Sequence, residues 1–323
     1  MKLFKRHKKR AKIIFFGTSD FSAGILSAIA AKHDVIGVIT QPDKPVGRKH
    51  EITASDASKM ARRLGIEARK PETLKGNHKV MEYLKKTAPE LIIVAAYGKM
   101  IPPEILRIPK FGALNVHPSL LPKYRGPSPI QSALVNRERR TGVTIILMDE
   151  KMDHGPIVCK KGTFIRIYEF YDRLERRLCA IARKLILKAI AKAVKGNPRA
   201  KPQNESKATY CKLLSREDGR IDWTMEVEDV FSRFRGYMYW PEIWTTFKGK
   251  KLVIKNCVPL YDIVNQEDPR PPGLVMEKNG RICIACSKHK LEIVELQLEG
   301  RARATIRTFV NGHQDFMGSV LPN

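Results

Sequence analysis

The feature that most constrains the fold is a series of short apolar runs separated by segments with helical periodicity. The runs at 12–17 ("KIIFFG"), 34–40 ("DVIGVIT") and 90–97 ("ELIIVAAY") are each bounded by turn-forming or polar residues. Apolar runs of this length are typical of strands buried on both faces. Further strands are expected at 66–69, 113–117 and 142–149, and helices near 20–32, 54–64, 77–87, 129–136 and 169–194. This β–α alternation predicts an α/β fold with a mostly parallel, doubly wound sheet.

The first strand, turn and helix could form a dinucleotide site, because a strand, a glycine-rich turn and a helix often bind a pyrophosphate. The turn reads Gly17-Thr18-Ser19-Asp20-Phe21-Ser22, with serines at the second and third glycine positions of G-x-G-x-x-G. The second glycine lets the backbone approach a pyrophosphate, so we do not expect NAD binding here.

A change in pattern near residue 195 indicates a second domain. The segment "KGNPRAKPQNES" breaks the preceding helix with Gly and Pro. Beyond it, closely spaced runs such as "KLVIKNCV", "RICIAC" and "KLEIVELQ" predict a small β-barrel-like (OB-like) domain. We therefore divide the chain into a basic tail (1–10), an N-terminal domain (11–190), a linker (191–207) and a C-terminal β domain (208–323).

Charge favours a polyanionic partner. The chain has 60 Lys/Arg and 33 Asp/Glu, a formal net charge of +27. Residues 1–204 hold 42 of these bases and 17 of the acids, so nearly all the excess lies in the first part. The loop 41–53 and the helix near 169–194 are both rich in bases. The phosphates of a nucleic acid are the matching partner, although a solvated basic surface has the same composition.

Membrane, secretory and metal classes are disfavoured. No apolar run approaches the roughly 20 residues that span a bilayer. The N-terminal "MKLFKRHKKRAKIIFFG" has the outline of a signal peptide, but its apolar part is too short, so we interpret it as a basic tail before the first strand. Cys283 and Cys286 form one C-x-x-C without a second pair, which predicts reduced thiols in a cytoplasmic protein and no metal.

The stretch "LNVHPSLLPKYRGPSP" (114–129) carries the candidate chemistry. Asn115 and His117 are two residues apart in a predicted strand, so both side chains point to the same side at its carboxyl end. Ligands bind at that edge of an open α/β sheet. An amide and an imidazole N–H there could together hold a developing oxyanion. The alternative, that both residues merely meet solvent where the strand ends, is left open by the spacing.

A third candidate comes from "MDEKMDHGPI" (148–157), which follows the next strand. Asp153 could orient the imidazole of His117 and assist proton transfer from an amine. Asp149 and Glu150 compete for this role, and His154 is a weaker candidate. Since no Ser or Cys stands in a nucleophile motif, the residues favour direct transfer of a group to an amine. They do not identify that group.

Four motifs resemble those of the methionyl-tRNA formyltransferases, a branch of the folate-dependent formyltransferases. They are "AYGKMIPPEIL", "GALNVHPSLLPKYRGPSPIQSAL", "TGVTIILMDEKMDHGPI" and "KLLSREDGRIDW", in the same order. The Asn-His…Asp set with "SLLP" and "RG" is common to formyltransferases that act on different amines. The "LLSREDGRIDW" segment and the following β domain are similar to the tRNA enzymes more specifically.

The resemblance implies the Rossmann-like formyltransferase fold and transfer of the formyl group of 10-formyltetrahydrofolate to the α-amino group of methionyl-initiator tRNA. The product would be N-formylmethionyl-tRNA for translation initiation. We expect a monomer. By similarity, the catalytic residues would be Asn115, His117 and Asp153. Residues implied in folate binding are Ser119, Leu120, Leu121, Pro122, Tyr97 and Gly98. Residues implied in tRNA binding are Lys44, Arg48 and Lys49, and Phe21 would approach the methionyl side chain.

The sequence departs from the family pattern at two places. Ser19 replaces the usual Pro of the first turn, a change expected to affect that turn only. Residues 205–323 are nearly neutral, with 18 bases and 16 acids, which fits poorly with a broad tRNA-binding surface. The tail and the basic helix are therefore expected to carry more of the tRNA contact. Two other functions are considered: a formyltransferase for a sugar nucleotide or another small amine, and a non-catalytic nucleic-acid-binding protein.

Overall fold

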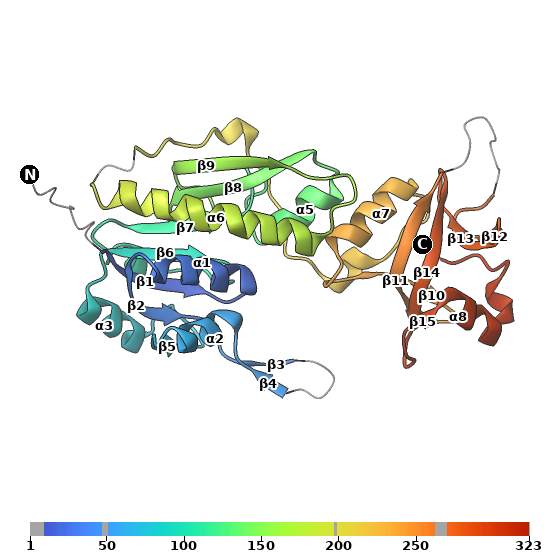
Figure 1. Cartoon of the computed structure of the whole chain (residues 1–323), viewed down its shortest axis with the longest axis horizontal. Helices are drawn as coiled ribbons and strands as arrows, with labels where there is room; N and C mark the ends of the chain where they lie inside the picture. The colour runs from blue at the N-terminus through green and yellow to red at the C-terminus, as the bar shows by residue number, and fades with distance from the viewer. Residues whose placement is uncertain (1–9, 47–50, 197–198, 262–269, 323) are drawn as a thin grey trace, which may run out of the picture. The chain divides into compact units, whose positions relative to one another are not determined.

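The chain forms two compact units whose borders follow packing rather than chain order. The computed structural model describes residues 10–46, 51–196, 199–261 and 270–322. The first unit comprises 1–129, 140–164 and 173–211; the second comprises 130–139, 165–172 and 212–323. Residues 199–211, much of which we expected to be a linker, therefore belong to the first unit. Figure 1 shows the elements of both.

The first unit is built on a seven-stranded sheet of order β5-β2-β1-β6-β7-β8-β9. The strands are β1 (Lys12–Gly17), β2 (Asp34–Ile39), β5 (Ala68–Arg69), β6 (Leu91–Ala95), β7 (Ala113–His117), β8 (Arg140–Leu147) and β9 (Ile157–Phe164). Strands β5, β2, β1, β6 and β7 run parallel, whereas β8 pairs antiparallel with both β7 and β9. The mostly parallel α/β sheet predicted from the sequence is confirmed.

Helices cover this sheet because its central strands are apolar on both faces. The helices of the first unit are α1 (Asp20–Ala30), α2 (Asp56–Arg63), α3 (His78–Thr87), α4 (Pro103–Leu106) and, from Arg173 on, α6 (Tyr171–Ala193). Apart from Pro129, α5 (Pro129–Val135) belongs to the second unit. Ile14 and Phe16 of β1 lie in one buried apolar cluster with Leu84 of α3 and Ile105 of α4. Helices α1 and α6 lie on the viewer's side of the sheet in Figure 1.

The basic loop predicted at 41–53 contains a short hairpin. Strand β3 (Lys44–Val46) pairs antiparallel with β4 (Glu51–Thr53). Polar and β-breaking residues hid this pairing in the sequence, since Pro45 lies within β3. Two of the predicted tRNA-binding residues, Arg48 and Lys49, fall outside the described residues, as does the tail up to position 9.

The second unit contains the predicted C-terminal β domain, an antiparallel sheet of order β10-β11-β14-β13-β12 with β15 also paired to β14. Its strands are β10 (Ile243–Phe247), β11 (Lys250–Leu260), β12 (Val275–Lys278), β13 (Arg281–Ala285), β14 (Lys290–Leu298) and β15 (Ala304–Thr305). Two helices not expected from the sequence accompany it, α7 (Val227–Gly236) and α8 (Ile306–Gly312). Trp223, Phe231, Phe234, Tyr237, Phe247, Phe309 and Phe316 are the buried aromatic residues of its core cluster.

The C-x-x-C of this unit is buried. Cys283 lies on β13, and Cys286 follows it. Burial raises the pKa of the Cys283 thiol to about 11 and that of Cys286 to about 12. Both thiols are therefore protonated at neutral pH and disfavoured as nucleophiles. Within the described residues, no helix is both long and apolar enough to span a bilayer.

Candidate active site

The carboxyl ends of three parallel strands are joined by hydrogen bonds at one edge of the sheet. Thr18, just after β1, and Gln41, after β2, both donate to the carbonyl oxygen of Tyr97, at 2.9 and 2.8 Å. Gly98 follows with φ +81°, and a Cβ on it would lie 2.4 Å from Gln41 Nε2. A glycine is therefore required where the chain leaves β6.

The carboxylate of Asp153 links the two candidate side chains of β7. Asn115 Nδ2 donates to Asp153 Oδ1 at 2.9 Å, and His117 Nδ1 lies 3.5 Å from Oδ2. The backbone N–H of Gly126 also donates to Oδ2, at 2.8 Å. The structure thus brings Asn115, His117 and Asp153 together; their catalytic roles remain a prediction.

The second ring nitrogen of His117 decides which tautomer the site holds. Its Nε2 lies 2.7 Å from the carbonyl oxygen of Tyr124. A carbonyl only accepts hydrogen bonds, so Nε2 carries the hydrogen. In the neutral ring, Nδ1 then has a lone pair on the side of Asp153. We expected Asn115 and His117 to act as a pair of donors, but in this tautomer the only ring N–H already bonds to Tyr124.

The competing acids are engaged elsewhere. Asp149 accepts from the Nδ1 of His154 at 2.6 Å and from the backbone N–H of Lys151 at 3.0 Å. Glu150 pairs with Arg107 at 2.7 Å, with both side chains largely exposed. Among the described residues, Asp153 is the acid paired with His117.

Hydrogen bonds within the loop and to Thr144 of β8 hold the loop after β7. Ser119 is fully buried; its hydroxyl donates to Lys123 O at 2.6 Å, and its carbonyl accepts from Thr144 Oγ1 at 2.7 Å. The backbone N–H of Leu121 donates to the same Thr144 hydroxyl at 3.1 Å. Ser119 and Leu121 therefore shape the loop. Leu120 and Pro122 are the partly exposed members of the predicted folate set.

Tyr97 reaches the site only by its backbone. Its ring is buried and packs edge-on against Phe16, with centroids 5.3 Å apart. Burial raises the pKa of the Tyr97 hydroxyl to about 12. Any contact of Tyr97 with a cofactor is therefore expected through its main chain, together with that of Gly98.

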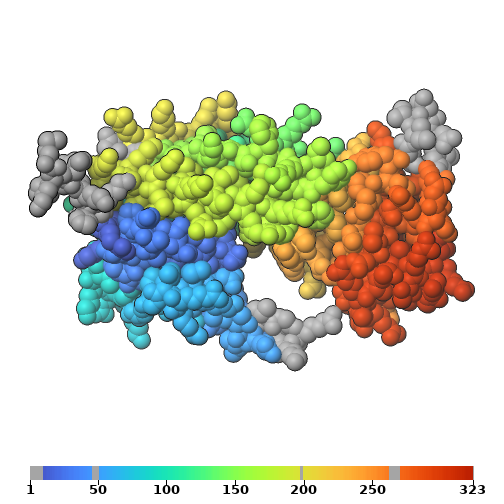
Figure 2. All heavy atoms as spheres, viewed as in Figure 1, coloured from blue at the N-terminus to red at the C-terminus, as the bar shows by residue number. Residues whose placement is uncertain are grey.

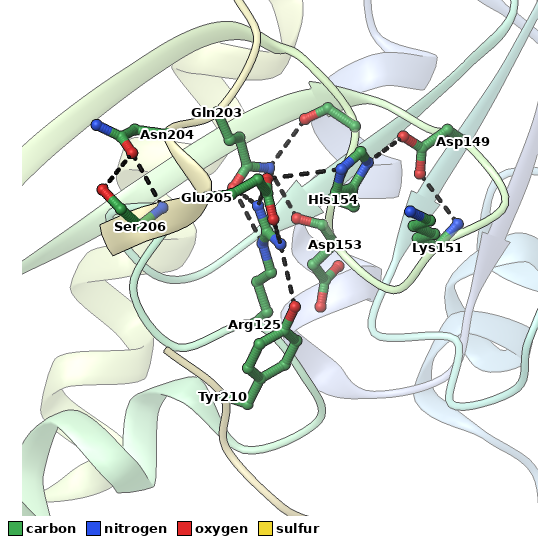
Figure 3. A network of polar contacts seen from close by, with 11 residues as sticks. Arg125, Asp149, Lys151, Asp153, His154, Gln203, Asn204, Glu205, Ser206 and Tyr210 are labelled. Carbon is green, nitrogen blue, oxygen red and sulfur yellow. Dashed lines mark hydrogen bonds and ion pairs between the residues drawn. The ribbon is translucent and has the colours of Figure 1, made fainter. Parts of the chain in front are cut away.

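Sequence reasoning missed a set of residues around Arg125, which Figure 3 shows. The Arg125 side chain is 1% exposed and bonds to Gln203, Glu205 and Tyr210. Gln203 in turn bonds to the backbone carbonyls of Asp153 and Gly155. Sequence periodicity gave no signal for these contacts, because Arg125 and Gln203 are 78 residues apart in the chain and neither belongs to a helix or strand.

The first unit also carries many exposed basic side chains. The exposed basic residues of α6 are Arg173, Arg176, Arg183, Lys184, Lys188 and Lys192. The helix forms much of the face of the first unit seen in Figure 2. Lys44 of β3 is exposed, and its Nζ donates to Gln41 Oε1 at 3.0 Å. In the described part of the chain, no group of three or more His, Cys, Asp or Glu side chains could hold a metal ion.

Two family models and full-length relatives match the chain. The family described as "Formyl transferase" matches residues 9–190, and "Formyl transferase, C-terminal domain" matches 213–314. The methionyl-tRNA formyltransferase of Caldicellulosiruptor saccharolyticus is 37% identical over 311 residues, covering 96% of this chain and 99% of that protein. A Staphylococcus aureus methionyl-tRNA formyltransferase is 34% identical, covering 95% and 97%.

Solved structures share the fold. HypX from Aquifex aeolicus, in complex with tetrahydrofolic acid, has a TM-score of 0.66 and 18% identity, covering 96% of this chain and 48% of that one. An N-formyltransferase from Helicobacter canadensis, with folinic acid and dTDP-3-aminofucose, has a TM-score of 0.63 and 15% identity, covering 88% and 99%. With both family domains matched and relatives aligned end to end, the chain belongs to the methionyl-tRNA formyltransferase family.

Proposed function

We propose that this protein transfers the formyl group of 10-formyltetrahydrofolate to the α-amino group of methionyl-initiator tRNA. The observation that carries the proposal is the Asp153 carboxylate, which joins the amide of Asn115 and the ring of His117. This arrangement stands at the carboxyl edge of the sheet, in a chain that aligns end to end with methionyl-tRNA formyltransferases.

The donor set fits a formyl donor and an amine. An amide NH₂ has two hydrogens, and the bond from Asn115 to Asp153 uses one of them. The other suits the carbonyl oxygen of a formyl group. The Nδ1 lone pair of neutral His117 suits the proton of an attacking amine. The loop 118–122 and the backbone at Tyr97 and Gly98 would hold the folate, which supplies a formyl group on nitrogen when bound.

The proposed mechanism assigns one task to each side chain. Asn115 donates to the formyl oxygen as negative charge develops there. The amine nitrogen bonds to the formyl carbon, and His117 accepts the amine proton at Nδ1. His117 then gives that proton to N10 of the folate as the bond between N10 and the formyl carbon breaks, while Nε2–H stays bonded to Tyr124. Asp153, facing Nδ1, stabilises the positive charge that the ring gains.

Removing the amide tests this assignment directly. Asn115→Ala should lower kcat about 10²–10³-fold, as expected for loss of one preorganised donor. Single-turnover formylation of charged tRNA measures the effect on the transfer step. An Asn115→Ala enzyme with undiminished kcat contradicts the role.

The net charge and the C-terminal domain favour tRNA as the acceptor. A net charge of +27 suits the phosphates of tRNA, and a C-terminal domain match accompanies the catalytic one. The alternative is a sugar nucleotide or another small amine. The solved structure with an amino-sugar nucleotide favours it only at the level of the fold, since that protein is 15% identical.

A matched set of acceptors separates these functions. The purified protein is incubated with 10-formyltetrahydrofolate and either methionyl-initiator tRNA, uncharged tRNA or a nucleoside-diphosphate amino sugar. We expect formylation of the charged tRNA alone. Formylation of the amino sugar with no reaction of the tRNA supports the alternative. Binding of tRNA without formylation of any acceptor would contradict the proposed activity and would indicate a non-catalytic tRNA-binding protein.

A further inference from the structure

We propose that the pair Gln203 and Glu205, which lies between the two matched family domains, is a positioning element of the active site. It holds the turn that carries Asp153, and thereby sets where the carboxylate stands relative to His117. The inference rests on the proposed function for its catalytic consequence. Its structural part can be tested without substrate.

The anchor of this element is the buried guanidinium of Arg125. Its Nη1 and Nη2 form a bidentate pair with Glu205, at 2.9 and 2.7 Å. A third bond reaches the Tyr210 hydroxyl at 3.1 Å. Glu205 supplies the negative charge that a buried guanidinium requires. Lys could not replace Arg here, since its single ammonium lacks this planar fork.

Gln203 transmits this anchor to the turn. Its Oε1 accepts from Arg125 Nε and Nη2, at 3.2 and 2.9 Å. Because guanidinium groups only donate, the amide oxygen must face Arg125, which turns the amide nitrogen the other way. That nitrogen donates to the carbonyl oxygens of Asp153 at 2.8 Å and Gly155 at 2.9 Å. The orientation of the Gln203 amide is therefore fixed, with its oxygen toward Arg125 and its nitrogen toward the Asp153 turn (Figure 3).

The turn needs such support. Asp153 has φ +49°, in the left-handed region that non-glycine residues seldom adopt. Gly155, two residues on, passes so close to Leu147 that a Cβ would lie 1.8 Å from its carbonyl oxygen. The Gln203 bonds fix the backbone on either side of His154, and Gly126 N–H fixes the carboxylate itself. The carboxylate therefore approaches Asn115 and His117 from a constrained direction.

A second link runs through His154. Its Nδ1 bonds to Asp149 at 2.6 Å, and its Nε2 lies 3.5 Å from Glu205 Oε1. The residue that seemed a weak catalytic candidate thus connects the turn to the same segment. Gln203 and Glu205, on either side of Asn204, consequently hold both the backbone and a side chain of the Asp153 turn.

Replacing the amide nitrogen of Gln203 by an oxygen tests the proposal. Gln203→Glu keeps the size and the oxygen facing Arg125, but it places a second oxygen against two carbonyl oxygens. Asn204→Asp is the matched control: it makes the same amide-to-acid change one residue away. Asn204 is exposed, and its side chain accepts from Ser206 within the same segment, which a carboxylate also does.

Two readouts are specific to positioning. We expect Gln203→Glu to lower kcat about 10- to 100-fold, as for a displacement of about 1 Å at a reacting group, with KM for both substrates little changed. We also expect faster hydrogen exchange of the Gly126 amide, which donates to the Asp153 carboxylate. The exchange measurement uses the full chain and no substrate, so it stands whether or not the proposed function does.

The control and a second variant decide the outcome. Asn204→Asp should match the unmodified chain in kcat and in Gly126 exchange. Should Gln203→Glu fold poorly, Gln203→Met removes the same bonds without adding charge and is expected to give the same two effects. Gly126 exchange as slow as in Asn204→Asp would overturn the proposal. Exchange that rises equally across the first unit would overturn it too, because it would indicate general destabilisation.

Discussion

Asp153 combines two demands at a single residue, a left-handed backbone and a negative charge. Asn tolerates positive φ better than most residues, whereas Ala does not. Asp153→Asn should therefore keep the turn and lose the charge that faces His117. We expect it to lower kcat about 10²–10⁴-fold, the range of acid–base catalysis, while the melting temperature changes little.

Asp153→Ala separates the two demands. It loses the charge and adds backbone strain of about 1–3 kcal/mol. Its kcat should be as low as that of Asp153→Asn, but its melting temperature should fall further. Single-turnover assays and thermal unfolding of both variants measure these effects. Equal melting temperatures for the two variants would contradict a strained turn.

Glu205 gives the site a defined response to acid. The Arg125 guanidinium lowers the pKa of this carboxyl below its ordinary value of 4.5. A group whose pKa falls on folding contributes stability above its unfolded pKa and loses it as the pH falls through the folded value. We expect Glu205→Gln to unfold at a lower temperature than the unmodified chain at pH 7. The difference should shrink below about pH 4.5 and disappear once Glu205 is protonated; melts between pH 3 and 7 test this.

At the scale of elements, local pattern predicted most of the first unit. The apolar runs became β1, β2, β6 and β7 within a few residues, because central parallel strands are buried on both faces. The direction of β8 could not be predicted, since an apolar strand pattern is the same whether its neighbour runs parallel or antiparallel. Strand β9 is mixed in burial, with exposed Lys160 and Lys161, which hid its apolar signal.

The same reasoning explains which parts of the site were predictable. Asn115 and His117 could be paired from the period of one strand, and Asp153 from the end of the next. The tautomer of His117 depends on Tyr124 O, a backbone atom placed by the loop fold. Arg125 and Gln203 depend on a segment that returns to the site from beyond α6, and no local pattern carries that information.

The β3–β4 hairpin is expected to contact tRNA through Lys44. Lys44 is exposed on β3, where the family resemblance implies tRNA contact. If Lys44 neutralises one phosphate, Lys44→Ala should reduce the slope of log binding constant against log salt by about one. Lys59 on α2 is the control, because its ammonium pairs with Asp56 at 3.3 Å. Titration of tRNA at several KCl concentrations provides the slopes, and equal slopes for the two variants would count against the contact.

For the whole molecule, charge is distributed along the chain in a way that favours contact through the first part. Residues 2–9 hold five Lys/Arg, and Arg10 bonds to Asp34 at 2.6 Å. Deleting 2–9 therefore removes bases while keeping that bond. We expect the deletion to flatten the salt dependence of tRNA binding and to leave the transfer step of saturated enzyme unchanged. A slope equal to that of the full chain would show that the tail makes no phosphate contact.

The return of 203–211 to the first unit has a consequence for building hybrid enzymes. Consider a crossover at residue 190, where the first family match ends. Positions 203 and 205 would then come from the donor, whereas Arg125 and the Asp153 turn would come from the recipient. Donor sequences that differ there would leave Arg125 without its acid and the Asp153 turn without its amide. A crossover just after Cys211 keeps these partners together, so exchange of the C-terminal β domain should begin there.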